Sequence, residues 1–140
     1  MEYRTIDDAL HGFVVSCLGG RSLPAARRIV AVDAALRRYL DDDGAGALPP
    51  DERVLVELER DLGTSDPLAR LVPADRLLGL LPGFIAATPS PTAVRRARLT
   101  QVWRLVQWLR SRGLVDAAAH AGDIARIREA LASVRTSRYH

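Results

Sequence analysis

Apolar residues recur along most of this chain at intervals of three and four residues, which is the spacing of one face of an α-helix. Thr5 stands where a helix cap is expected, and Gly19 with Gly20 provides a stop signal. We therefore predict a first helix over residues 6–18. Its inward positions are Ile6, Leu10, Phe13, Val14 and Cys17.

A second helix is predicted to begin after Ser22, because Ser is a favoured cap and Pro24 falls in the first turn. Its apolar stripe ends where three aspartates precede a Gly-Ala-Gly run at residues 41–46. That composition predicts a mobile acidic loop. The inward residues of this helix are Ile29, Leu36 and Leu40.

Three shorter helical segments are predicted in the middle of the chain. Residues 50–63 form an amphipathic pattern in which Glu57, Glu59, Arg60 and Asp61 point outward. A short turn of helix follows at residues 67–71, and another helix begins at Pro73, with a break or kink expected at Pro82–Gly83. The inward residues predicted for residues 50–63 are Val54, Leu55, Leu58 and Leu62.

The segment at residues 90–114, "SPTAVRRARLTQVWRLVQWLRSRGL", is both strongly apolar and strongly basic, with six arginines and no acid. At 100° per residue its apolar positions cover more than half of the helix circumference, which predicts a central helix with neighbours on several sides. Trp103 and Trp108 are assigned to the core. The other apolar positions of the arc are Val94, Ala97, Leu99, Val102, Leu105, Val106 and Leu109.

After Gly113 we expect a short helix and then a last helix at residues 123–134, with a frayed tail at residues 135–140. No strand pattern rises above noise. The predicted fold is all-α, a compact orthogonal bundle of five to seven helices in a single domain covering residues 1–134.

The amino-acid composition limits the kinds of functional site that we expect. All 20 basic residues are arginine, and the net charge is +3. Cys17 is alone and the three histidines lack ligand spacing, so we expect no disulfide, metal or other cofactor. No nucleophile–base set or phosphate loop points to an enzyme or to a small-molecule substrate. Without a signal peptide or membrane-length apolar run, we expect a cytoplasmic protein with no membrane partner.

A narrow polar edge on the segment at residues 90–114 suggests DNA binding. Arg96, Thr100, Arg104 and Gln107 are residue types that contact nucleic-acid phosphates. "SLPAARR" at residues 22–28 and "SPTAVRR" at residues 90–96 also each open a helix with an Arg pair, and helix N-termini suit phosphates. The alternative is a solvated edge paired with acids among residues 41–61. The predicted DNA-binding residues are Arg27, Arg28, Arg95, Arg96, Thr100, Arg104 and Gln107.

The order of these segments resembles the N-terminal core-binding domain of tyrosine recombinases and phage integrases. Residues 6–18 resemble its first helix, "SLPAARRIVAVDAALRRYL" its second, and "PADRLLGLLPGFIAA" its acidic-start helix, while "SPTAVRRARLTQVWRLVQWLRSRGLV" is the best match. The family's capping Thr is replaced by Ala25, and its catalytic half has no counterpart here. The resemblance implies DNA clamping without strand cleavage, with Arg27, Arg28, Arg95 and Arg96 near phosphates.

Two functions therefore remain open. The first is a small non-catalytic protein that contacts DNA phosphates through arginines. The second is a helical protein-interaction or adaptor module that uses an exposed apolar surface. Its partner is either another protein or a second copy of the chain. The segment "RLLGLLPGFIAA" is apolar on nearly every side, which indicates either deep core or such a surface. Its residues in question are Leu77, Leu78, Leu80, Leu81, Phe84 and Ile85.

Overall fold

The computed structural model describes residues 3–87 and 92–137. Within these ranges the chain forms seven α-helices and two 3₁₀ turns and contains no β-strand, which confirms the predicted all-α fold. In chain order the elements are α1 (Ile6–Leu18), α2 (Leu23–Asp42), η1 (Gly44–Ala47), α3 (Pro50–Asp61), α4 (Pro67–Leu71), η2 (Ala74–Arg76), α5 (Leu77–Ala86), α6 (Thr92–Ser111) and α7 (Ala121–Ser137).

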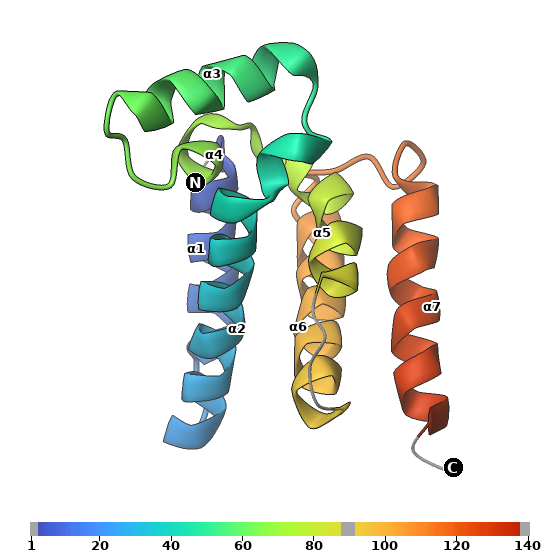
Figure 1. Cartoon of the computed structure of the whole chain (residues 1–140). Helices are drawn as coiled ribbons and strands as arrows, with labels where there is room; N and C mark the ends of the chain where they lie inside the picture. The colour runs from blue at the N-terminus through green and yellow to red at the C-terminus, as the bar shows by residue number, and fades with distance from the viewer. Residues whose placement is uncertain (1–2, 88–91, 138–140) are drawn as a thin grey trace.

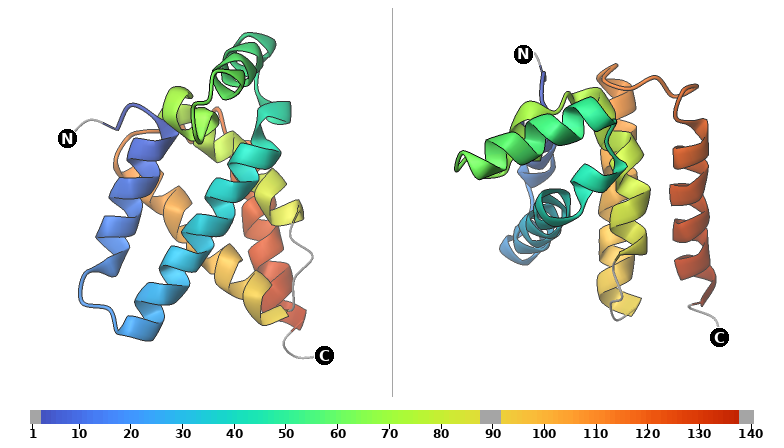
Figure 2. Two further views of the ribbon diagram at one scale, coloured as in Figure 1. Left: turned by 60° about the vertical axis from the view of Figure 1, so that its left-hand side comes forward. Right: turned by 45° about the horizontal axis from the view of Figure 1, so that its top comes forward.

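Helix α6 occupies the middle of the bundle, as its wide apolar arc predicts. It contacts α1, α2, α5 and α7, and it lies between the α1–α2 pair and α7 (Figures 1 and 2). Helix α3 lies across one end of the other helices, where it contacts α4 and η1 (Figure 1). The molecule therefore has a packed helical body and one helix placed across its end.

The first two helices begin where their caps predict. The Thr5 hydroxyl accepts a hydrogen bond from the Asp8 amide at 3.2 Å, and the Asp8 carboxylate accepts one from the Thr5 amide at 3.3 Å. This reciprocal pair satisfies two amides that a helix start otherwise leaves unpaired. The Ser22 hydroxyl accepts from the Ala25 amide in the same way.

The buried side of α6 holds both expected and unexpected residues. Trp108 is buried and packs edge-on against the rings of Tyr3 and Phe13. Gln101, which was not assigned to the core, is also buried, because its side-chain amide donates to the Ile29 carbonyl of α2 at 2.9 Å. Val94, in contrast, was expected in the apolar arc but is 41% exposed.

Two predicted interruptions of the chain are more regular than expected. Residues 41–46 do end α2, at Asp42, but a 3₁₀ turn, η1, follows after Asp43 in place of an open loop. Helix α5 also runs without a break through Pro82. A proline in a helix costs about 3 kcal/mol. Burial of each large apolar side chain on either side of Pro82, such as Leu81 and Phe84, contributes about 1.5–3 kcal/mol and outweighs that cost.

The C-terminal part also differs from expectation. The residues between α6 and α7 form turns rather than a short helix, with the Asp116 carboxylate accepting from the Ala118 amide. Helix α7 begins at Ala121 and continues to Ser137, three residues into the segment expected to fray. Residues 138–140 of that segment lie outside the described residues.

Arg37 joins α1 to α2 through two carboxylates. Its Nε donates to Asp33 at 2.9 Å, one helical turn away, and its Nη1 donates to Asp7 of α1 at 2.6 Å. Burial raises the pKa of Asp33 above its ordinary value, although Arg37 acts to lower it. Burial also works to lower the pKa of Arg37, but its bonds to Asp7 and Asp33 outweigh that effect and raise it.

Candidate interaction surfaces

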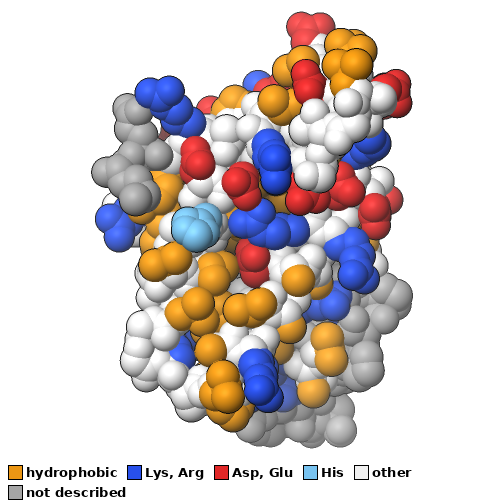
Figure 3. All heavy atoms as spheres, turned by 90° about the vertical axis from the view of Figure 1, so that its left-hand side faces the viewer, with side chains coloured by type: hydrophobic (Ala, Val, Ile, Leu, Met, Phe, Trp, Pro, Cys, Tyr) orange, Lys and Arg blue, Asp and Glu red, His pale blue; other side chains and the backbone are white. Residues whose placement is uncertain are grey.

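The apolar face of α3, which we define as Val54, Leu55, Leu58 and Leu62, is turned to the outside of the molecule. These four side chains were predicted to point inward, and that prediction is wrong: their exposed fractions run from 46% to 71%. Only Val56 of this helix is buried. Figure 3 shows hydrophobic side chains at the surface over the end of the molecule that α3 forms.

The orientation of α3 follows from its two arginines. Arg53 donates to the carbonyls of Ala45, Gly46 and Leu48 at 3.1–3.3 Å, and Arg60 donates to Asp41. Both guanidinium groups and Val56 therefore face the body of the protein. The apolar face and the acids beside it are left outside, and those acids are Asp51, Glu57, Glu59 and Asp61.

The apolar side chains of α5, which were also candidates for an interaction surface, are buried rather than exposed. Leu77, Leu78 and Leu81 of α5 are completely buried, and Leu80, Phe84 and Ile85 are at most 7% exposed. These side chains are therefore core, although Ile85 also lines a hollow beside α6 and α7. Helix α3, in contrast, presents four exposed apolar side chains on one helix.

The polar edge of α6, which we define as Arg96, Thr100, Arg104 and Gln107, runs between α1 and α7. Arg104 and Gln107 are exposed, whereas Arg96 and Thr100 are partly buried. The Arg96 Nε is buried without a hydrogen-bond partner among the described residues. These four residues thus lie on one side of one helix, as their spacing predicts.

Two arginines from outside α6, Arg128 of α7 and Arg21 between α1 and α2, flank this polar edge. Arg128 of α7 lies over the ring of Trp103 at 5.4 Å. On the side of α1, burial raises the pKa of the Cys17 thiol, while the nearby charges of Arg104 and Arg21 act to lower it. Arg21 and Arg128 could not be predicted from the sequence, because only the packing of α1 and α7 against α6 brings them close to it.

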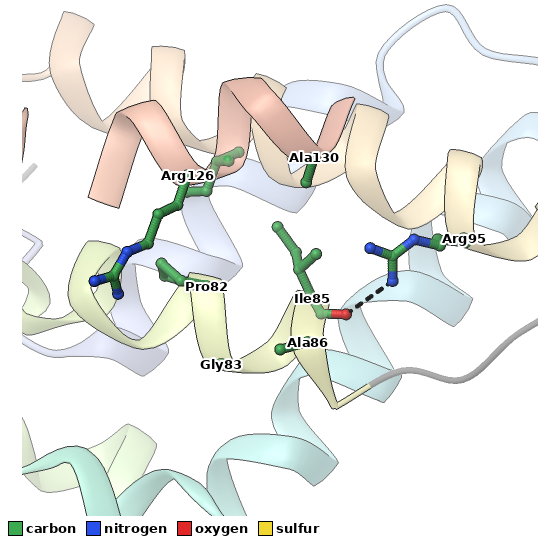
Figure 4. A pocket seen from close by; sticks show the side chains of 8 residues that line it. Pro82, Gly83, Ile85, Ala86, Arg95, Arg126 and Ala130 are labelled. Carbon is green, nitrogen blue, oxygen red and sulfur yellow. Dashed lines mark hydrogen bonds between the residues drawn. The ribbon is translucent and has the colours of Figure 1, made fainter. Parts of the chain in front are cut away.

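Arg95 occupies a different place. It lines a hollow between α5, α6 and α7, and its Nη1 donates to the Ile85 carbonyl at 3.1 Å (Figure 4). Arg126 of α7 lies at the other end of the labelled side chains, beyond Pro82 (Figure 4). The Arg95 guanidinium is therefore used in holding α6 to α5.

Arg28 lines a third surface, the α2–α6 hollow, of about 340 Å³. This hollow lies between the N-terminal halves of the two helices, and Arg98 lines it together with Arg28. Arg27, its neighbour in sequence, is exposed on α2. The remaining lining of the hollow is apolar and consists of Ala31, Val32, Ala93, Val94 and Ala97.

The seven predicted DNA-binding residues are therefore distributed over several places around α6 and α2. Ion pairs in the described part of the chain include those of Arg37, Arg60 and Arg76, and none of the seven takes part in one. Of the acids among residues 41–61, Asp41 pairs with Arg60 of α3 and Glu52 pairs with Arg76 of η2.

Comparisons with protein-family models, with curated proteins and with solved structures found no match. Among the described residues, no helix combines the length and the apolar character that crossing a membrane requires.

Proposed function

We propose that this protein is a non-catalytic helical module that binds a protein partner through the apolar face of α3. The exposure of Val54, Leu55, Leu58 and Leu62 on one side of one helix carries this proposal. Exposure of contiguous apolar side chains to water is unfavourable, and their burial against a partner lowers the free energy. Helix-in-groove recognition uses side chains at this spacing.

The charges around the apolar face indicate the chemistry of the partner. Asp51, Glu57 and Asp61 are exposed on the outer side of α3, while Arg53 and Arg60 are turned inward. A partner with basic side chains around an apolar strip complements this pattern, whereas an acidic partner is repelled.

A designed peptide tests the proposal directly. The probe is a fluorescent helical peptide of about 20 residues with leucines on one face and arginines beside them. We expect it to bind at least about tenfold more tightly than the same peptide with glutamate in place of arginine. Binding is measured by fluorescence anisotropy.

Variants of the protein locate the binding surface. Leu58→Ser with Leu62→Ser is expected to weaken binding of the basic peptide, because both side chains belong to the apolar face of α3. The control is Val15→Ser, which alters a 58% exposed valine on α1. Equal affinity of the α3 variant and the control would contradict the proposal.

DNA binding is a second candidate, and the polar edge of α6 favours it. Arg104 and Gln107 are exposed there, Arg96 and Thr100 lie beside them, and Arg21 is close to Arg104 through Cys17. Side chains of these types position proteins on phosphates. In this form the proposal rests on the polar edge of α6 rather than on Arg27, Arg28 or Arg95. It keeps the DNA-clamping role that the resemblance to recombinase core-binding domains implies.

A further inference from the structure

We infer that the partner of the apolar face of α3 is the α2–α6 hollow of a second copy of this chain, so that copies associate head to tail. This inference rests on the proposed function, since it names an occupant for the same face. It is carried by the match between two surfaces of one molecule, one convex and acidic at its edges and the other concave and lined by arginines.

The two surfaces match in shape and polarity. The apolar face of α3 is a helical ridge, with Leu58 and Leu62 more than half exposed. The α2–α6 hollow is a depression of about 340 Å³ with an apolar lining, and Val94 at its surface is exposed. Leucine side chains entering the hollow would remove apolar area from water on both sides of the contact.

The two surfaces also match in charge. Glu57 and Asp61 are exposed beside the apolar face of α3. Arg28 is exposed and lines the α2–α6 hollow, with Arg27 next to it. Opposite charges around an apolar contact favour one orientation of the partners, and like charges disfavour pairing of α3 with a second α3.

Their positions require that the contact forms between molecules. The hollow involves the N-terminal halves of α2 and α6, whereas α3 follows the C-terminal end of α2 (Figure 1). Helix α2 has 20 residues and is therefore about 30 Å long, which separates the two surfaces on one chain. A contact between two different surfaces is heterologous, and without a closing rotation it produces open chains of molecules.

Sedimentation of the unmodified protein gives the first test. A single helix in a shallow hollow is a small interface, so association is expected in the range from about 10 µM to about 1 mM. The average mass should rise with concentration and pass that of a dimer. A mass that stays at the monomer throughout this range overturns the inference. If the basic peptide still binds α3 in that case, the proposed function stands with a different partner; if it does not, both fail.

Two variants, each with one altered surface, distinguish head-to-tail contact from pairing of like surfaces. Leu58→Asp places a charge on the apolar face of α3, and Val94→Asp places one in the α2–α6 hollow. For each variant alone, we expect the association constant to fall at least about tenfold. An equimolar mixture should form a heterodimer and stop there, because only one functional ridge and one functional hollow meet.

Other results of these experiments would indicate a different mode of association. If Val94→Asp alone still dimerises while Leu58→Asp does not, α3 pairs with α3, which overturns the inference and leaves the proposed function intact. Arg28→Glu repeats the test of the hollow by reversing a charge at an exposed position. Val15→Asp, at a 58% exposed position on α1, is the control and should associate like the unmodified protein. Circular dichroism of every variant verifies that it is folded.

Discussion

Arg37 connects two helices, because its guanidinium group is shared by two carboxylates, one on α1 and one on α2. The Asp33 side chain is only 16% exposed, whereas that of Asp7 is 44% exposed. Asp33 and Arg37 are four residues apart, so they lie one turn apart on the same side of α2. Arg37 is the partner, and through it Asp33 is also connected to α1.

Replacement of Arg37 should therefore destabilise the fold. Arg37→Met leaves Asp33 partly buried without its hydrogen-bonded partner, and we expect a loss of about 1–3 kcal/mol in the free energy of unfolding near pH 7. The pKa of Asp33 is already raised above 3.8 by burial, and it rises further when Arg37 is removed. Urea unfolding at about pH 7 and about pH 4 measures the effect.

The direction of the pH dependence follows from that shift. A carboxyl whose folded pKa is raised contributes stability below its unfolded pKa, and this contribution is lost as the pH rises through the folded value. The loss caused by Arg37→Met should thus be smaller near pH 4, where Asp33 is more often protonated. The control is Asp7→Asn, expected to cost no more than about 1 kcal/mol because Asp7 is more exposed. Equal losses in the two variants would contradict this account.

Helices α3 and α5 show how context decides which side of an element is buried. Both carry leucines at several positions, yet those of α5 are core and those of α3 are exposed. Helix α5 packs against α2, α6 and α7, whereas α3 packs mainly against α4 and η1. With one small contact area, α3 is oriented by the hydrogen bonds of Arg53 and Arg60 as much as by Val56.

The hydrogen bonds of Arg53 are therefore expected to hold α3 against η1. Arg53→Gln removes the guanidinium that reaches three carbonyls around η1, and we expect a loss of about 1–3 kcal/mol in stability. Amide hydrogen exchange should become faster in residues 44–61 and change little in α6, because the effect is local to α3 and η1. The matched control is Arg70→Gln at an exposed position on α4. Uniformly faster exchange in α6 would show that α3 is part of the main cooperative unit.

The distribution of charge over the whole molecule separates an acidic end from basic surfaces. The net charge of +3 is small, but Asp51, Glu57 and Asp61 gather on α3, and arginines lie along α6. A modest net charge can thus coexist with a local basic surface, which is what DNA binding requires. The same separation is the basis of the charge complementarity in the proposed head-to-tail contact.

Salt dependence tests the DNA proposal at this level. If Arg96 and Arg104 each contact one phosphate, affinity for random duplex DNA should fall about tenfold between about 50 and about 200 mM salt, because each contact releases counterion. Arg104→Gln should reduce this salt dependence by about half, whereas Arg70→Gln should not change it. Fluorescence anisotropy with labelled duplex is the measurement. Absence of binding at low salt would remove DNA from consideration and leave the protein-interaction proposal.

The all-α fold and the starts of α1 and α2 could be predicted from the sequence because their signals are local. Thr5 and Ser22 act within three residues of their own position, and the spacing of apolar residues in α1, α2 and α6 needs no knowledge of neighbours. The polar edge of α6 follows from the same spacing. These features were determined by short-range chemistry alone.

Only the tertiary structure decided how the helices share their surfaces. The outward rotation of α3, the burial of Gln101 and the use of Arg95 to hold Ile85 all depend on groups in other elements, between five and 72 residues away. Periodicity identifies the apolar side of a helix, but whether another element covers that side depends on packing between distant segments. For this reason the apolar face of α3 is a surface and the leucines of α5 are core.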